Sequence, residues 1–317
     1  MRIALIVDPL PSLKAYKDTS IAIMRAAQAA GHAVWVIQQE AIHWSSLHGV
    51  CAEAVHLEML ADDSDWFVEV DRHVVALRDF RAVLMRKDPP FDMEYVTTTW
   101  LLERAEVEGA RVFNRPRALR DHSEKLSVTE FARFAIPTTA ARDAGVIHSF
   151  IEVERDTVLK PLDGMGGSEV FRVRHDDPNR NVIVETLTRH GTRTIMAQRY
   201  IPEIADGDKR ILIVGGEVVP YCLARIPKAG ETRGNLAAGG TGVARELSPR
   251  DREIAGALAP LLAARGLLLV GLDVIGDWLT EINVTSPTCM VEIAEQTGFD
   301  SAALFVTALE RQCVVAA

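Results

Sequence analysis

The sequence predicts a mixed fold, in part α/β and in part α+β, divided into two or three subdomains. Its 317 residues are too many for one small core, because domains usually hold about 100–200 residues. Residues 2–7 and 34–37 are rich in isoleucine and valine, which is typical of buried parallel strands. Between them, residues 18–20 can cap a helix that runs through Ala30. The chain therefore opens with a βαβ unit, although it lacks the GxGxxG pattern of dinucleotide-binding proteins.

Three stretches differ in their pattern of predicted elements. Residues 1–122 form an N-terminal α/β domain, residues 123–201 open on a helix and are then rich in strands, and residues 202–317 are mixed. Residues 40–75 carry few strong signals. Beyond the opening unit, the predicted strands are 82–85, 111–113, 157–162, 170–173, 196–201, 210–214, 217–224, 267–275 and 280–283, and the predicted helices are 94–108, 123–135 and 250–265.

Charge and cysteine content narrow the class of partner. The net charge of −9 argues against a general nucleic-acid or membrane-surface binder, since such proteins usually lean basic. The four cysteines show no CxxC pair, so a reducing cytoplasm is expected. The first apolar run is too short for a secretory signal, and the longest one, 258–276, is interrupted by Arg265 and Asp273. We expect small-molecule partners, with no nucleic acid and no membrane.

A glycine-rich loop follows a lysine at the end of a predicted strand. Lys160 precedes the sequence Asp-Gly-Met-Gly-Gly-Ser at 163–168. A lysine supplies a point charge for phosphates, and glycines let backbone N–H groups approach the phosphate oxygens. The loop is not a Walker A motif, because no GKS or GKT follows. The alternative is a hairpin turn with a surface lysine.

Two predicted strands carry three oxygen donors. Glu281 and Asn283 are two residues apart, so they share one face of a strand. A two-residue hairpin loop would put Asp273 opposite Thr280, whereas a three-residue loop would put it opposite Glu281 and gather all three donors. Hard oxygen ligands of this kind suit Mg²⁺, and Mn²⁺ after it, at a nucleotide-phosphate site. The alternative is a solvated strand face.

Three arginines surround a second glycine-rich segment, residues 229–242. They are Arg210, Arg225 and Arg233. Arginines beside a flexible loop suit a lid that closes over carboxylate or phosphate groups. The alternatives are a snorkelling arginine at a strand end for Arg210 and a solvated loop residue for Arg233. The nine histidines are scattered and are interpreted as structural or surface residues.

Several long runs follow one another along the chain: MRKDPPFD at 85–92, LRD at 119–121, EKL at 124–126, KPLDGMGG at 160–167, GDKR at 207–210, PYCLARIP at 220–227, and the segments 230–240 and 279–288. Together they make the sequence resemble prokaryotic glutathione synthetase along nearly its whole length. The resemblance departs at residues 40–75 and after about residue 295. It implies an ATP-grasp fold with an N-terminal Rossmann-like (pre-ATP-grasp) domain, a central lid domain and a C-terminal catalytic domain.

The resemblance also implies roles for residues. ATP would lie between the last two domains, with Lys125 and Lys160 on its phosphates and Asp208 near the ribose. Arg210, Arg225 and Arg233 would be catalytic. The other implied nucleotide contacts are Gly164, Met165, Gly166, Gly167, Gln198, Arg199, Tyr200 and Ile201. The implied dipeptide contacts are Lys17, Asp18, Ser20, Arg86, Asn235 and Ser286.

The implied reaction joins γ-glutamylcysteine to glycine through an acyl phosphate, with ATP as cosubstrate, and releases ADP and phosphate. Loops 164–167 and 226–241 would exclude water as lids. A D-alanine–D-alanine ligase is one alternative, but it would lack the runs at 85–92 and 230–240. An ATP-grasp-like kinase and a non-catalytic nucleotide-binding module are the others. The resemblance further implies a homo-oligomer, a tetramer.

Overall fold

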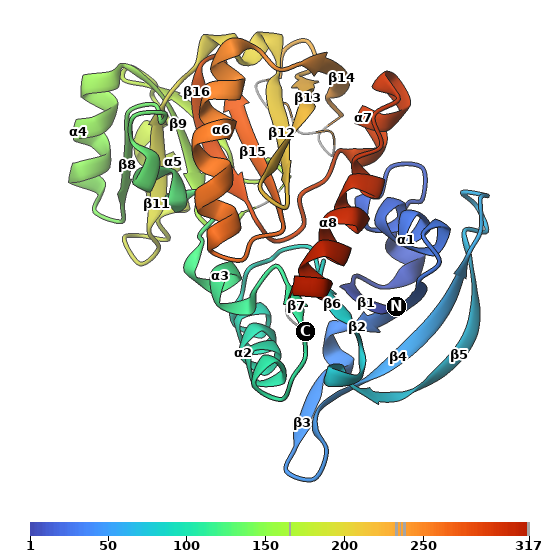
Figure 1. The fold of residues 1–317 in the computed structure, drawn as a ribbon. Coiled ribbons are helices and arrows are strands. Elements are labelled where there is room, and N and C mark those ends of the chain that lie inside the picture. Colours follow the sequence, from blue (N-terminus) through green and yellow to red (C-terminus); the bar gives the residue numbers. More distant parts are fainter. Residues whose placement is uncertain (165, 232–233, 235, 237–238, 316–317) are drawn as a thin grey trace.

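Three β-sheets follow one another along the chain in the computed structural model (Figure 1). The structure describes residues 1–164, 166–231, 234, 236 and 239–315. The sheets occupy residues 2–113, 138–199 and 208–283. The predicted domain boundaries after residues 122 and 201 fall between sheets and stay a prediction.

The N-terminal sheet is built around the predicted βαβ unit. β1 pairs in parallel with β2 on one side and β6 on the other, and β6 pairs in parallel with β7. Asp18 accepts a hydrogen bond from the backbone of Ile21 at 3.0 Å and so caps helix α1 (Thr19–Ala29), as the sequence predicts. Helices α2 (Met93–Val107) and α3 (Pro116–Asp121) follow β6 and β7. The strands, in spatial order, are β3 (His43–Ser45), β4 (Gly49–Met59), β2 (Ala33–Gln38), β1 (Arg2–Val7), β6 (Ala82–Met85) and β7 (Val112–Phe113).

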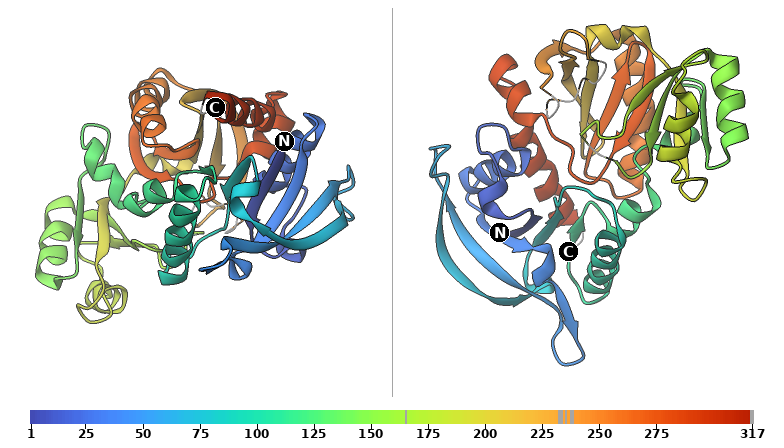
Figure 2. Two further views of the ribbon diagram at one scale, coloured as in Figure 1. Left: turned by 60° about the horizontal axis from the view of Figure 1, so that its bottom comes forward. Right: turned by 180° about the vertical axis from the view of Figure 1, so that it is seen from behind.

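The segment 40–75 forms a long antiparallel hairpin. β4 pairs with β5 (Phe67–Ala76), and the two strands curve along the outer edge of the molecule (Figure 2). β5 is exposed on both faces along most of its length, so its side chains do not divide into a buried face and a solvent face. Three single-turn 3₁₀ helices complete the N-terminal part of the fold: η1 (Leu10–Ser12), η2 (Gln39–Ala41) and η3 (Leu77–Asp79).

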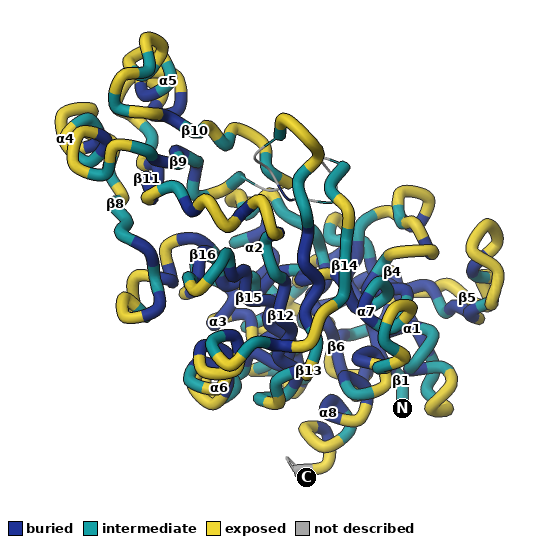
Figure 3. The backbone as a smooth tube through the Cα atoms, turned by 90° about the horizontal axis from the view of Figure 1, so that it is seen from above, coloured by how far each residue is buried: buried dark blue, intermediate teal, exposed yellow. Residues whose placement is uncertain are grey.

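The central sheet is small and antiparallel, and it projects away from the other two (Figure 3). Helices α4 (Ala144–Glu154) and α5 (Arg180–Leu187) cover one of its faces and form an apolar cluster with it. The helix predicted at 123–135, which leads into this sheet, is wrong, because residues Leu126–Phe131 form a 3₁₀ helix, η4. The strands, in spatial order, are β10 (Phe171–Arg174), β9 (Asp156–Pro161), β11 (Ile195–Arg199) and β8 (Thr138–Ala141).

The C-terminal sheet is antiparallel and has helices on both faces. α6 (Pro249–Ala264) begins with a capping box between Ser248 and Asp251 and packs on one face. α7 (Met290–Thr297) and α8 (Ser301–Val315) pack on the other, where α8 also contacts α1 of the N-terminal domain (Figure 1). The strands, in spatial order, are β14 (Thr241–Glu246), β13 (Glu217–Ile226), β12 (Asp208–Val214), β15 (Leu269–Ile275) and β16 (Trp278–Asn283), and η5 (Pro202–Asp206) precedes β12.

Candidate active site

A cavity of about 340 Å³ lies between the central and C-terminal sheets. Strand alternation decides which side chains of the central sheet face it. Leu159 and Val173 belong to the apolar cluster under α4 and α5, so the neighbouring Val158, Lys160 and Arg172 line the cavity on the opposite face. Lys160 therefore faces the cavity rather than the outer surface of a simple hairpin.

The predicted metal ligands line this cavity from β15 and β16. Asp273 lies opposite Glu281, which is the pairing that gathers the three predicted ligands. The loop between the strands differs from the expectation, because only Gly276 and Asp277 connect them. A bulge at Thr280 shifts the register by one residue. The bulge residue Thr280 thus has the effect on the register that the alternative of a three-residue loop gave to a third loop residue.

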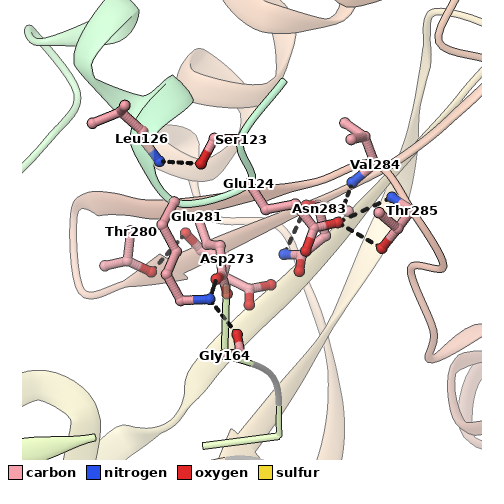
Figure 4. A network of polar contacts seen from close by, with 12 residues as sticks. Ser123, Glu124, Leu126, Gly164, Asp273, Thr280, Glu281, Asn283, Val284 and Thr285 are labelled. Atoms are coloured by element: carbon pink, nitrogen blue, oxygen red, sulfur yellow. Dashed lines mark hydrogen bonds and ion pairs between the residues drawn. The ribbon is translucent and has the colours of Figure 1, made fainter. Parts of the chain in front are cut away.

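Asn283 is the third predicted metal ligand and offers an amide. Its Nδ2 donates to the carbonyl of Gly271 at 3.2 Å, which leaves its Oδ1 for another partner. Across the residues that the structure describes, no three His, Cys, Asp or Glu side chains gather as a metal cluster. In the predicted metal site, this amide oxygen would join the carboxylates of Asp273 and Glu281, which lie near it on the same pair of strands (Figure 4).

Acidic and basic side chains alternate along one wall of the cavity. Arg210 donates to Asp273 from Nε at 2.5 Å and from Nη2 at 3.1 Å. Arg225 Nη2 lies 2.8 Å from Asp273 and 2.6 Å from Asp208. A side chain at Gly271 would meet Arg210, because a Cβ there would lie 2.8 Å from the arginine Cδ. Both arginines are buried, so the snorkelling alternative for Arg210 is wrong.

These contacts set the charge states of the two aspartates. Burial alone would raise the pKa of Asp273, but Arg210 and Arg225 hold that pKa below its ordinary value. Asp208 also contacts Arg225, yet burial dominates there and raises the pKa of Asp208 to about 6. Its Oδ1 is buried and has no hydrogen-bond partner among the described residues. Asp273 therefore stays ionised at neutral pH, whereas the carboxyl group of Asp208 titrates close to neutral pH.

Two lysines reach the cavity from different elements. Lys125, just before η4, places Nζ 2.8 Å from Glu281 Oε1 and donates to the carbonyl of Gly164 at 2.6 Å. Burial alone would lower the pKa of Lys125, but the Glu281 carboxylate raises it above its ordinary value. Burial lowers the pKa of Lys160. Lys125 is therefore a permanent cation that links the glycine-rich loop to the strand of the predicted metal ligand Glu281.

The other predicted nucleotide residues border the same cavity. Gln198 is buried and donates to Thr138 Oγ1 at 3.1 Å, which fixes its side chain. Arg172 lies over the ring of Tyr200, with Cζ 3.6 Å from the ring centroid. Met165 lies outside the described residues. The predicted residues that line the cavity here are Gly164, Gly166, Gly167, Gln198, Arg199, Tyr200 and Ile201.

The predicted dipeptide residues fall into two groups. Ser286 lines the cavity, whereas the other four described ones do not. Arg86 is buried and donates to Ser20 Oγ at 3.2 Å and to the carbonyl of Pro287 at 3.0 Å, so it lies behind the cavity wall. Asp18 caps α1, and Lys17 is exposed.

The second predicted lid, residues 226–241, lies partly outside the described residues. Arg233 and Asn235 lie outside the described residues, so their predicted contacts stay predictions. The described Gly234 and Leu236 line the cavity. At least this part of the glycine-rich segment 229–242 therefore borders the site.

Sequence reasoning missed several residues that line the cavity. Glu124 and Arg172 were detectable: the first adjoins Lys125 in a matched run, and the second lies on the strand paired with that of Lys160. Cys289 carried no signal, because its position depends on the chain path after β16. The missed residues are Asp88, Glu124, Arg172, Thr285, Thr288 and Cys289.

Comparisons with known proteins agree with this geometry. Residues 1–120 match the family model for the N-terminal domain of prokaryotic glutathione synthetase, and residues 124–298 match that for its ATP-grasp domain. A glutathione synthetase from Ralstonia nicotianae is 58% identical over 98% of this chain and 96% of its own. One from Neisseria meningitidis serogroup B is 53% identical over 98% of each chain.

Solved structures show the same fold at low sequence identity. A D-cycloserine synthetase has a TM-score of 0.68 at 17% identity, covering 99% of this chain and 100% of that one. A RimK-domain ATP-grasp protein from Sphaerobacter thermophilus has a TM-score of 0.60 at 19% identity, covering 98% and 100%. The predicted ATP-grasp fold is confirmed.

The fold and the cavity define an ATP-dependent ligase of the ATP-grasp class. Within that class, the chain belongs to the prokaryotic glutathione synthetase family, and the predicted glutathione synthetase function is confirmed. The matches do not favour the D-alanine ligase, the kinase or the non-catalytic module. No helix in the described part of the chain is long and apolar enough to cross a membrane.

Proposed function

We propose that the cavity activates the carboxylate of γ-glutamylcysteine as an acyl phosphate and then joins it to the amine of glycine. The observation that carries this proposal is the alternation of charge along the wall. Two buried arginines flank Asp273, and Lys125 contacts Glu281, which faces Asp273 across the hairpin. Cations and anions placed this closely can receive both the phosphates of ATP and a metal.

Asp273, Glu281 and Asn283 would hold Mg²⁺, or Mn²⁺ as the alternative. All three offer oxygen atoms on one cavity wall, and the Asn283 Oδ1 is left for a further partner. These are the hard donors that Mg²⁺ takes when it keeps other positions for water and phosphate oxygens. When bound, the metal neutralises charge on the phosphate groups during in-line transfer.

The protein groups divide the remaining work. Lys125 and Lys160 bind phosphate oxygens, and the backbone of 164–167 closes over them. The strand end at 198–201 holds adenine, and Asp208 accepts a hydrogen bond from the ribose. Arg210 and Arg225 stabilise the acyl phosphate and the tetrahedral intermediate that forms when the amine attacks. Arg233 and Asn235 belong to the same proposal as contacts to the substrates.

The dipeptide is proposed to bind where Ser286 lines the cavity. Arg86 lies behind that wall, and its Nη1 is buried without a hydrogen-bond partner among the described residues. A buried guanidinium N–H without a partner favours a carboxylate or carbonyl oxygen nearby. Ser20 accepts a hydrogen bond from Arg86, and the proposal places Lys17 and Asp18, which precede it in the chain, on the same side of the site.

The cytoplasm is the proposed location, and a homotetramer is the proposed assembly. All four cysteines are buried and unpaired, which suits a reducing compartment. The tetramer stays a prediction from the family resemblance.

Mass spectrometry of the product tests the proposed reaction directly. With ATP, Mg²⁺, γ-glutamylcysteine and glycine, we expect one glutathione for each ADP released, and both substrates should be needed for full turnover. Equally fast ADP release with D-alanine alone would contradict the proposal. A phosphorylated product that accumulates in place of the peptide would point to a kinase.

Asp208 should make nucleoside binding depend on pH. Because burial raises its pKa to about 6, the carboxylate is largely protonated below pH 6 and accepts the ribose hydroxyl poorly. Affinity should therefore rise as pH increases through 6. Calorimetry with adenosine, which has no titrating phosphate, measures this from pH 5 to 8. Asp208→Asn should bind with an affinity that does not change over this range, and a wild-type curve as flat as that of the variant would contradict the assignment.

A further inference from the structure

The chain just before η4 runs beside β16, the edge strand of the C-terminal sheet. The backbone N–H of Ile282 donates to the carbonyl of Glu124 at 2.9 Å, and Leu279 N–H donates to the carbonyl of Phe134 at 2.9 Å. An edge strand otherwise leaves such groups to solvent. Residues 124–134 therefore serve as an additional partner along the outer edge of β16.

The Glu124 side chain contacts the segment that leaves this strand. Its Oε1 accepts hydrogen bonds from Val284 N–H at 2.9 Å, Thr285 N–H at 3.0 Å and the Thr285 hydroxyl at 2.8 Å (Figure 4). Asn114 holds the same segment from the other side, because its Nδ2 donates to the Val284 carbonyl at 2.8 Å. The peptide groups that follow Asn283 are thus fixed by two side chains from the first 124 residues.

The next residue acts on the same face from another direction. Lys125 contacts Glu281 directly at 2.8 Å. Glu124 acts on Asn283 indirectly, because it binds the backbone N–H of Val284, the next residue. Two consecutive residues thus reach both proposed metal ligands of β16. Glu124 also lines the cavity. Its three hydrogen bonds join an oxygen at the edge of the cavity to the backbone that follows Asn283.

We propose that Glu124 is a positioning residue that fixes the metal-binding face of the cavity through Val284 and Thr285. This inference rests on the proposed metal role of Glu281 and Asn283. A carboxyl oxygen suits the task because it can accept hydrogen bonds from several donors at once. Losing them frees the end of β16, and a displacement of about 1 Å at such a site can cost about 100-fold in rate.

Binding of ADP with and without Mg²⁺ tests the inference independently of turnover. In the wild type, Mg²⁺ should tighten ADP binding. We call the ratio of the dissociation constants for ADP without and with Mg²⁺ the Mg²⁺ factor. In Glu124→Ala this factor should fall about tenfold, and kcat should fall at least about tenfold with little change in the KM for glycine. Glu124→Gln keeps an acceptor oxygen and should stay within about threefold of wild type in both measurements.

Glu108→Ala is the matched control. Glu108 likewise accepts a backbone hydrogen bond, from Val50 at 2.8 Å, but it does not line the cavity. The Glu108→Ala enzyme should lose thermal stability without any change in the Mg²⁺ factor. If Glu124→Ala does not fold, Thr285→Val removes one donor of the three and should lower the factor by a smaller amount.

The outcomes are distinguishable. A wild-type Mg²⁺ factor that Glu124→Ala retains, together with normal kcat below its melting temperature, would overturn the positioning role alone. A wild-type enzyme that gains nothing from Mg²⁺ would overturn the proposed metal site, and the inference with it. A lowered factor in Glu124→Ala that Glu124→Gln restores would support the inference.

Discussion

Glu281→Gln is expected to lower kcat at least about 100-fold while the protein remains folded, because even the loss of a residue that only supports a metal ligand typically costs about 10–100-fold. The change keeps the shape of the side chain and removes its charge. Glu281 faces Asp273 across the hairpin and contacts Lys125 at 2.8 Å, so the variant weakens both the metal set and the lysine contact. Steady-state ADP release at saturating ATP and Mg²⁺ measures the effect.

The control for this prediction is Glu130→Gln. Glu130 forms an ion pair with Arg265 at 2.7 Å, and neither residue lines the cavity. It should change kcat little, since exposed ion pairs contribute at most about 1 kcal/mol to stability. A Glu281→Gln enzyme that melts early but keeps its specific activity would assign Glu281 a structural role instead.

The sequence predicted the parts of the fold that bury apolar runs. β1, β2 and β6 lie at the centre of the N-terminal sheet and are buried over most of their length, so their sequences are nearly continuous in apolar residues. β5 could not be found in this way, because it is an exposed edge whose strand conformation depends on pairing with β4.

Helix α8 differs from β5, because its sequence carries the periodicity of a helical face. Its buried residues Ala302, Phe305, Val306, Leu309 and Cys313 follow the three-to-four spacing of a helical face.

The metal-binding face could be predicted only as a set of alternatives. Spacing put Glu281 and Asn283 on one face, but the position of Asp273 depended on the hairpin register. The structure reaches the predicted pairing by a bulge at Thr280, which no local pattern announced. Lys125 is about 150 residues away in sequence, so only the family resemblance brought it to the site.

Arg210→Ala is expected to lower kcat at least about 100-fold, the cost of removing one preorganised donor from a developing oxyanion. The variant should also change the pH dependence. Arg210 and Arg225 together hold the pKa of Asp273 below its ordinary value, and Asp273 must be ionised to serve as a metal ligand. Without Arg210 that pKa rises, so activity should be lost at a higher pH on the acid side.

The dependence of kcat on pH, on its acid side (the acid limb), separates control of the ionisation of Asp273 by Arg210 from general damage to the fold. Arg210→Lys keeps a positive charge near Asp273 but not the two-point contact, so it should shift the limb less than alanine does and recover only part of kcat. Arg265→Ala, which removes an arginine that does not line the cavity, should leave the limb in place. If Arg210→Ala loses activity equally at every pH, Arg210 does not control the ionisation of Asp273, and its effect is confined to the reacting groups.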